Sequence, residues 1–142
     1  MDIILGSDHA GFDLKQACKV QLEQSGKHKV LDIGVHSRRS SDYPRVAHKV
    51  AQAISNGEFS RGALICGTGL GMSIVANRYP SVRAALCHNL YTVQMSRRHN
   101  NANILVMGGR VIGIGLALEM LDLFLKEKFE GGRHQSRLDQ ID

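Results

Sequence analysis

"ALICGTGLGMSIVANR", residues 63–78, joins a short apolar run to a helix-like segment through three glycines on alternate positions. The run at 63–66 is short enough for a buried strand, and the glycines allow a tight turn before a helix expected over 70–78. Strand, turn and helix form the repeating unit of an α/β protein. The stretch also places Cys66 at the strand end, where it is either a small core residue or a thiol at the mouth of a ligand-binding loop.

The same alternation continues outward from this stretch in both directions. Further strands are expected at 2–6, 28–34, 82–87 and 102–109, and further helices at 11–25, 43–56, 90–98 and 113–128. The pattern predicts an α/β fold with a five-stranded parallel sheet, for which we expect the strand order 2-1-3-4-5. In the first helix, Leu14 and Cys18 are expected to face the sheet and Lys15 to face water.

The chain has 142 residues, the size of one ordinary domain, and shows no internal repeat or linker. We therefore expect a single domain over 1–142, in which residues 129–142 form a C-terminal arm. Two glycines end the last helix, and the residues after them are polar and charged. The arm must therefore lie on a surface, either that of its own chain or that of a partner.

Composition narrows the possible functions. No stretch approaches the roughly 18 apolar residues of a membrane span, and Met1 leads directly into a strand, so a soluble, cytoplasmic protein is expected. The three cysteines form no C-x-x-C pair, which argues against a disulfide framework and a zinc site. A net charge of +5 with an aromatic content of 5% favours a small anionic ligand over nucleic acid or a membrane.

Ligands of parallel sheets bind at the carboxyl ends of strands, near the point where the strand order reverses. Asp8 and His9 follow the first strand, Cys66 ends the third, and Arg110 follows the fifth. "GTGLG" (67–71) matches neither the dinucleotide-binding pattern nor the P-loop, but its backbone N–H groups can form a nest for an anionic oxygen. The positive end of the next helix favours the thiolate of Cys66. A tight turn that binds nothing is the competing interpretation.

The remaining candidates each have a structural explanation as well. Capping of the following helix accounts for Asp8, and the helix dipole accounts for a histidine such as His99 at a helix end. Arg133 and Arg137 stand four residues apart, so one helical turn would present both to a phosphate, although a solvated basic tail needs no ligand. Cys18 and Cys87 are expected to be structural.

Five segments together resemble the ribose-5-phosphate isomerase B family, which also contains the allose- and galactose-6-phosphate isomerases. In chain order they are "GSDHAGF" (6–12), "SDYP" (41–44), "ICGTGLGMSIVANR" (65–78), "SRRHNNANILVMGGRVIG" (96–113) and "FEGGRHQSR" (129–137). The resemblance covers nearly the whole chain. It implies a Rossmann-like three-layer α/β/α sandwich that works as a homodimer or homotetramer with shared active sites.

The activity that the resemblance implies is aldose–ketose isomerisation of D-ribose 5-phosphate and D-ribulose 5-phosphate through an enediol, with no metal or cofactor. Cys66 would move the proton between C2 and C1, His99 would help to open the furanose ring, and Thr68 and Asp8 would complete the catalytic set. The implied sugar contacts are Asp8, His9, Tyr43, Gly67, Thr68, Gly69, Leu70, Gly71 and Asn100, with loop amides holding the oxyanion. The implied phosphate contacts are His9, Arg110, Arg133 and Arg137.

Two other functions stay open at this point. One is isomerisation of a six-carbon phosphosugar, allose or galactose 6-phosphate. The other is a non-catalytic phosphosugar-binding or nucleotide-binding module built on the same sheet. The combination of Cys66, His99 and Asp8 favours an enzyme over a binding module, because binding alone needs no such set of acids and bases.

Overall fold

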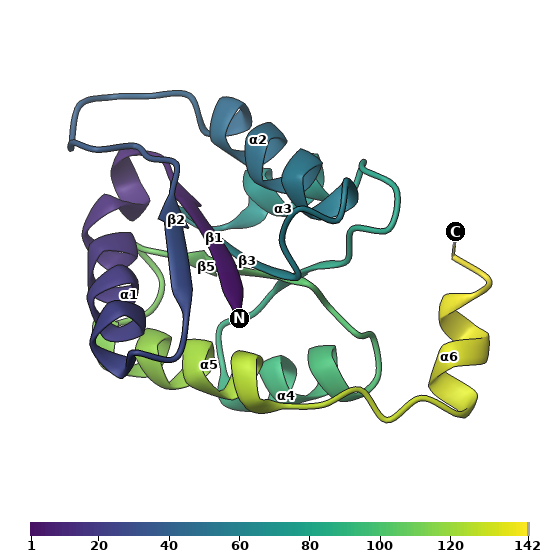
Figure 1. Cartoon of the computed structure of the whole chain (residues 1–142). Helices are drawn as coiled ribbons and strands as arrows, with labels where there is room; N and C mark the ends of the chain where they lie inside the picture. The colour runs from purple at the N-terminus through teal and green to yellow at the C-terminus, as the bar shows by residue number, and fades with distance from the viewer. Residues whose placement is uncertain (142) are drawn as a thin grey trace.

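The computed structural model describes residues 1–141 (Figure 1). The strands are β1 (Asp2–Ser7), β2 (Lys29–Asp32), β3 (Arg61–Cys66), β4 (Ala84–Leu86) and β5 (Ile104–Gly108). The helices are η1 (His9–Gly11), α1 (Phe12–Ser25), α2 (Tyr43–Ser55), α3 (Leu70–Ala76), α4 (Leu90–Arg98), α5 (Ile114–Lys126) and α6 (Arg133–Leu138). None of these helices is long and apolar enough to cross a bilayer.

All five strands are parallel and lie in the order β2-β1-β3-β5-β4, which confirms the predicted α/β class with its five-stranded parallel sheet. The predicted order 2-1-3-4-5 is wrong for the last two strands. β5 is buried at all five positions, whereas the three residues of β4 are only half-buried. A strand that is apolar on both faces gains most from a central place, so β5 pairs with β3 and the shorter β4 takes the edge.

The sheet lies between two layers of helices, with α1, α4 and α5 on one face and α2 and α3 on the other (Figure 1). Side chains alternate along each strand, so Ile3 and Leu5 of β1 join the core under α1 and α5 while Ile4 joins the core under α2. α2 packs closely enough that a Cβ on Gly6 would lie 2.4 Å from Val46 Cγ1. This close approach needs a glycine in the strand.

The strand order reverses between β1 and β3. The chain leaves β1 toward β2 on one side and returns to β3 on the other, and the two strands pair so that Ser7 lies opposite Ile65. Asp8 and Cys66 are therefore carried to the same point of the sheet. Ligands of open parallel sheets bind at such a point, outside the carboxyl ends of the strands.

The C-terminal arm is partly helical and partly docked. α6 stands beyond the three layers (Figure 1), yet His134 and Leu138 are each only 6% exposed. A groove of about 260 Å³ between the arm and the body is lined by Arg83, Asn101, Gln135, Leu138 and Asp139. The predicted arm therefore lies on its own chain over part of its length, with two buried side chains that its polar composition concealed.

Candidate active site

The candidate site begins at the carboxyl ends of β1, β3 and β5. Asp8 N–H donates to the Ile65 carbonyl at 3.2 Å, which joins the first two strand ends. Gly109 N–H donates to the Cys66 carbonyl at 2.8 Å, and Arg110 N–H donates to the Gly67 carbonyl at 3.0 Å. These backbone bonds bring Asp8, Cys66 and Arg110 to the carboxyl ends of the strands, as their positions at strand ends predict. This end of the sheet is called the carboxyl edge below.

The Cys66 thiol lies at the base of the glycine loop. Its Sγ accepts a hydrogen bond from Gly69 N–H at 3.1 Å, and Gly69 has a φ of +82°, a left-handed conformation that favours glycine. A backbone donor aimed at sulfur stabilises its negatively charged form. Cys66 is only 4% exposed, so the thiol is more enclosed than a position at the mouth of a cleft suggests.

Two amides of the loop are already engaged within the chain. Gly69 N–H is bound to the sulfur, and Leu70 N–H donates to Thr68 Oγ1 at 3.2 Å. Because Oγ1 accepts this bond, the Thr68 hydroxyl hydrogen is left to donate outward. Gly71 lies in the first turn of α3, where an amide has no partner within the helix, and it remains available to an anionic oxygen.

Tyr43 forms a wall of the glycine loop. A Cβ on Gly71 would lie 2.4 Å from the Tyr43 ring, so the ring rests directly against the glycine backbone. Beside the loop, the Arg110 side chain approaches Gly67, where a Cβ would lie 3.4 Å from Nη1. An aromatic ring and a guanidinium thus flank the segment that the sequence suggested as an anion nest.

His9 is held by a reciprocal pair of hydrogen bonds with Ser41. His9 N–H donates to Ser41 Oγ and Ser41 N–H donates to His9 Nδ1, both at 3.1 Å. Because Nδ1 accepts a bond, the neutral ring carries its proton on Nε2, which becomes a donor for a ligand oxygen. Asp8 Oδ1 accepts from Gly11 N–H at 3.1 Å, so Asp8 does cap η1.

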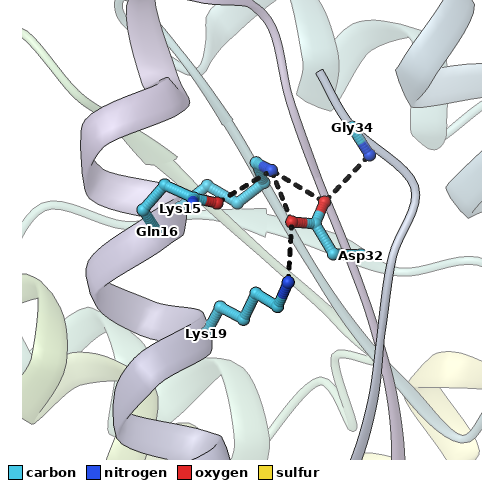
Figure 2. Close-up of polar contacts among 5 residues, drawn as sticks. All are labelled: Lys15, Gln16, Lys19, Asp32 and Gly34. Atoms are coloured by element: carbon cyan, nitrogen blue, oxygen red, sulfur yellow. Dashed lines mark hydrogen bonds and ion pairs between the residues drawn. The ribbon is translucent and has the colours of Figure 1, made fainter. Parts of the chain in front are cut away.

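A buried ion pair lies at the end of β2, where it contacts Gly34 at the start of the following loop, and sequence reasoning missed it (Figure 2). Lys15 was expected to face water, but its side chain is fully buried and Nζ lies 2.6 and 2.7 Å from the two Asp32 oxygens. Asp32 Oδ1 also accepts from Gly34 N–H at 2.9 Å, and Gly34 accepts from Ser7 N–H at 2.7 Å. Lys15 can be buried because Asp32, at the end of β2, supplies the opposite charge. The only sequence signal was that aspartate in "KVLD".

The other predicted site residues lie at the amino ends of the strands, at the opposite end of the sheet. This end is called the amino edge below. His99 follows the last residue of α4 and precedes β5. Ile104 at the start of β5 pairs with Gly62, while Cys66 pairs with Gly108. Four residues of strand separate these two pairs, which corresponds to about 13 Å. Within one chain, His99 and Asn100 therefore cannot share a small ligand with Cys66.

The arm joins His99 at this amino edge. The rings of His99 and His134 stack with centroids 4.1 Å apart, and Glu130 N–H donates to the Arg98 carbonyl at 3.0 Å. Burial is the main cause that lowers the pKa of His134, followed by the positive charges of His99 and Arg133. Because Arg133 and Arg137 belong to the same arm, half of the predicted phosphate contacts lie here and the other half, His9 and Arg110, lie at the carboxyl edge.

The ligand atoms of His99, Glu130 and His134 lie within 4.8 Å of one another. Two imidazoles and a carboxylate form a donor set that suits zinc. The two rings, however, are stacked with only 13° between their planes. Since each nitrogen lone pair lies in the plane of its ring, stacked rings do not aim at a common point. The observed geometry thus fits stacking better than metal binding.

The other two cysteines differ from Cys66. Burial raises the pKa of Cys18 to about 12, and burial also raises the pKa of Cys87. Both stay protonated thiols at neutral pH and behave as small core residues. Only Cys66 combines a strand end, a glycine loop and a backbone donor on its sulfur.

Comparison with known proteins shows the family to which the chain belongs. The sequence matches the ribose/galactose isomerase family over residues 3–141. The chain belongs to this family. It is 45% identical to ribose-5-phosphate isomerase B of Escherichia coli (strain K12), across 98% of this chain and 93% of that one. It is 41% identical to D-erythrulose-4-phosphate isomerase of Pectobacterium atrosepticum, across 99% of this chain and 93% of that one.

Solved structures give the same result. The structure of Clostridium thermocellum ribose-5-phosphate isomerase B matches with a TM-score of 0.97 and 50% sequence identity, covering 99% of this chain and 95% of that chain. Coverage is nearly complete on both sides. The protein is an isomerase of the ribose/galactose isomerase family.

Proposed function

We propose that the protein interconverts D-ribose 5-phosphate and D-ribulose 5-phosphate through an enediol, at a site formed between two copies of the chain. The observation that carries this proposal is the Cys66 thiol at the strand-order reversal, with a backbone donor on its sulfur and a donor loop beside it. A thiolate poised there can act as a general base next to a preformed anion nest.

Binding would be dominated by the phosphate group. His9 Nε2–H and the Arg110 guanidinium supply donors at the carboxyl edge, and Arg133 and Arg137 of a second copy supply two more. Arginine binds phosphate oxygens bidentately and keeps its charge at all relevant pH values. Energy from this remote group holds C1 and C2 of the sugar against Cys66.

The chemistry follows in two stages. His99 of a second copy helps to open the furanose by moving a proton between the ring oxygen and the C1 hydroxyl. The Cys66 thiolate then removes the proton on C2 and returns it to C1, while one hydroxyl proton moves from O2 to O1. The aldehyde carbon is reduced and the adjacent carbinol carbon is oxidised, so no external redox partner is needed.

Negative charge on the enediolate oxygens is met by donors of the glycine loop. The Gly71 amide and the outward-pointing Thr68 hydroxyl suit this task, and Asn100 of a second copy and Asp8 would hold the sugar hydroxyls. One preorganised donor of this kind is worth about 2.7–4 kcal/mol in the transition state. Tyr43 would pack against the sugar from the other side of the loop.

A second copy is required because one chain carries its candidate residues on two opposite edges. An isologous dimer would place the amino edge of each chain over the carboxyl edge of the other, giving two identical shared sites. The same contact would form a wall over the enclosed Cys66 sulfur. A homotetramer built from two such dimers keeps these sites unchanged.

The decisive experiment is an assay of purified protein with ribose 5-phosphate, run on wild type and Cys66→Ala in parallel. The variant is expected to lose both turnover and solvent-deuterium exchange at C2, while calorimetry still detects binding of the phosphosugar. Full turnover in Cys66→Ala would end the proposal. Tight phosphosugar binding by a wild type that isomerises no sugar phosphate would identify a binding module instead.

A second experiment determines how many carbons the preferred sugar phosphate has. The similarity to a D-erythrulose-4-phosphate isomerase favours testing a four-carbon phosphosugar beside the five-carbon one, and the family description includes galactose. Values of kcat/KM for four-, five- and six-carbon phosphosugars decide the preference. We expect the five-carbon substrate to have the highest value.

A further inference from the structure

Arg98, next to His99, forms an ion pair with Glu127, which lies just before the arm that carries Arg133 and Arg137. Arg98 Nε donates to Glu127 Oε2 at 2.5 Å, and Arg98 Nη2 donates to Oε1 at 3.4 Å. The guanidinium therefore forms hydrogen bonds with both carboxylate oxygens. The fork geometry of arginine fixes direction as well as distance. The pair joins the last residue of α4 to the residue that follows α5.

Arg97 reinforces the same junction from inside the protein. It is 2% exposed, its Nε donates to the Glu127 carbonyl at 3.3 Å, and Nη1 donates to the Ala102 carbonyl at 2.5 Å and to Asn101 Oδ1 at 3.0 Å. Burial lowers the pKa of Arg97 to about 10, so the group remains charged at neutral pH. The turn at 99–102 is thus held on its inner side.

The segment that follows Glu127 has little of its own to fix its direction. α5 ends at Lys126 and α6 begins at Arg133, and between them Gly131 and Gly132 have φ values of +68° and +55°. Two successive glycines with positive φ can adopt many backbone conformations, so this stretch does not fix the direction of the chain by itself. The direction of the arm therefore depends on Glu127, on the hydrogen bond from Glu130 N–H to the Arg98 carbonyl, and on the stacking of His134 against His99.

We propose that Glu127 is a positioning residue for catalysis, which sets His99 and the arm arginines in the relative geometry that a second copy needs. The proposal rests on the proposed function, because it concerns the half of the site that reaches across to Cys66 of another chain. Glu127 itself touches no reacting atom. It acts through Arg98 on the turn of His99, and through the chain direction on Arg133 and Arg137.

The test is Glu127→Gln, which keeps the shape of the side chain and removes its charge. We expect kcat/KM for ribose 5-phosphate to fall between tenfold and a hundredfold, and competitive inhibition by inorganic phosphate to weaken. Asp122→Asn is the matched control, since it removes the Lys126–Asp122 ion pair one turn earlier, at 2.7 Å on an exposed surface. That control is expected to retain wild-type kcat/KM.

A second readout separates positioning from general stability. Nuclear magnetic resonance titration of the His134 ring in the free protein should show its pKa moving back toward the ordinary histidine value in Glu127→Gln, because the released arm no longer buries the ring. Glu127→Asp should restore part of the lost activity. If Glu127→Gln does not fold, Arg98→Lys, which keeps the charge and loses the fork, is expected to show the same two effects more weakly.

Wild-type kcat/KM in the variants, with an unchanged His134 titration, would overturn the positioning role. A loss of activity with no change in phosphate inhibition or in the His134 titration would overturn it as well. Failure of the proposed function looks different: the wild type would then isomerise no sugar phosphate, while the His134 titration would still report on the tie between Arg98 and Glu127.

Discussion

The carboxyl edge and the amino edge of the sheet present their chemistry in different ways. At the carboxyl edge, Asp8, Cys66 and Arg110 follow strands directly, and backbone hydrogen bonds fix them. At the amino edge, His99 lies on a turn after a helix, and side chains such as Arg97 and Arg98 tie it to the arm. The first edge is built by the sheet and the second by a network around it.

This difference is the reason for the proposal that one chain does not form a complete site. A sheet of parallel strands can gather base, oxyanion donors and one set of phosphate contacts at a single edge, but every helix returns the chain to the other edge. A residue at the end of α4 is therefore at least a strand length from Cys66. In the proposed dimer each chain supplies two half-sites, and a change at one half-site should leave the other intact.

The largest expected effect is recovery of activity when two inactive variants are mixed. Cys66→Ala and His99→Ala homodimers each lack one essential group in both sites and should be inactive. After joint unfolding and refolding, half of the dimers are mixed, and each mixed dimer has one intact site of two. The assay should therefore recover about a quarter of wild-type activity, as expected for an isologous dimer.

The control for this mixture is Cys66→Ala combined with His99→Ala on one chain, mixed with wild type. Its mixed dimers have no intact site, so activity should follow the fraction of wild-type homodimers alone. Both mixtures should therefore show about a quarter of wild-type activity. No recovery in the first mixture, together with about half of wild-type activity in the second, would mean that each chain uses its own His99, and the distinction between the two edges would collapse.

The next effect concerns the scaffold of the carboxyl edge. Lys15→Met leaves the Asp32 carboxylate buried without its partner, and breaking a buried pair in this way costs about 3–5 kcal/mol. Lys19→Met is the matched variant, because Lys19 Nζ lies 3.9 Å from Asp32 Oδ2 and its side chain is 34% exposed. Such pairs contribute about 0–1 kcal/mol. Urea unfolding measures both, and equal losses would contradict the burial argument.

A smaller effect is expected at the wall of the glycine loop. Gly71→Ala drives a methyl group into the Tyr43 ring, and overpacking of this kind costs about 1–3 kcal/mol. If that strain shifts the donor loop, kcat/KM falls roughly 10- to 100-fold. Gly115→Ala in α5 is the control, since a Cβ there meets nothing within 4 Å. A wild-type rate in Gly71→Ala would show that the loop does not depend on this wall.

The parts that the sequence predicted well are those fixed by neighbours along the chain. Strand, turn and helix around Cys66 follow from a local pattern of apolar residues and glycines, and so do the strand-end positions of Asp8 and Arg110. The separation of His99 from Cys66 was not among the predictions, although topology implies it, since a helix that follows a parallel strand ends near the start of the next strand.

Long-range partners account for what the sequence did not predict. β5 lies beside β3 and β4 lies at the edge of the sheet. Which strand is buried on both faces depends on the packing of all strands and helices, and no local pattern contains that information. Lys15 looked solvent-exposed because its partner, Asp32, lies 17 residues away on another element. The buried face of the arm depends on a stack between His99 and His134, which are far apart in sequence and polar in composition.

The smallest effect is a pH dependence confined to the amino edge. Since burial lowers the pKa of His134 in the docked arm, the free arm takes up a proton first as pH falls through about 6.5. Docking is therefore fully favoured above that value and weakens below it. The hydrogen bond from Arg98 lowers the pKa of Glu127, so its contribution is lost only at still lower pH.

Hydrogen exchange of residues 133–138, corrected for intrinsic rates, should rise between pH 7.5 and 5.5 while that of residues 67–71 stays constant. His134→Gln should remove the rise, and parallel changes at both edges would mean that the two half-sites are not independent.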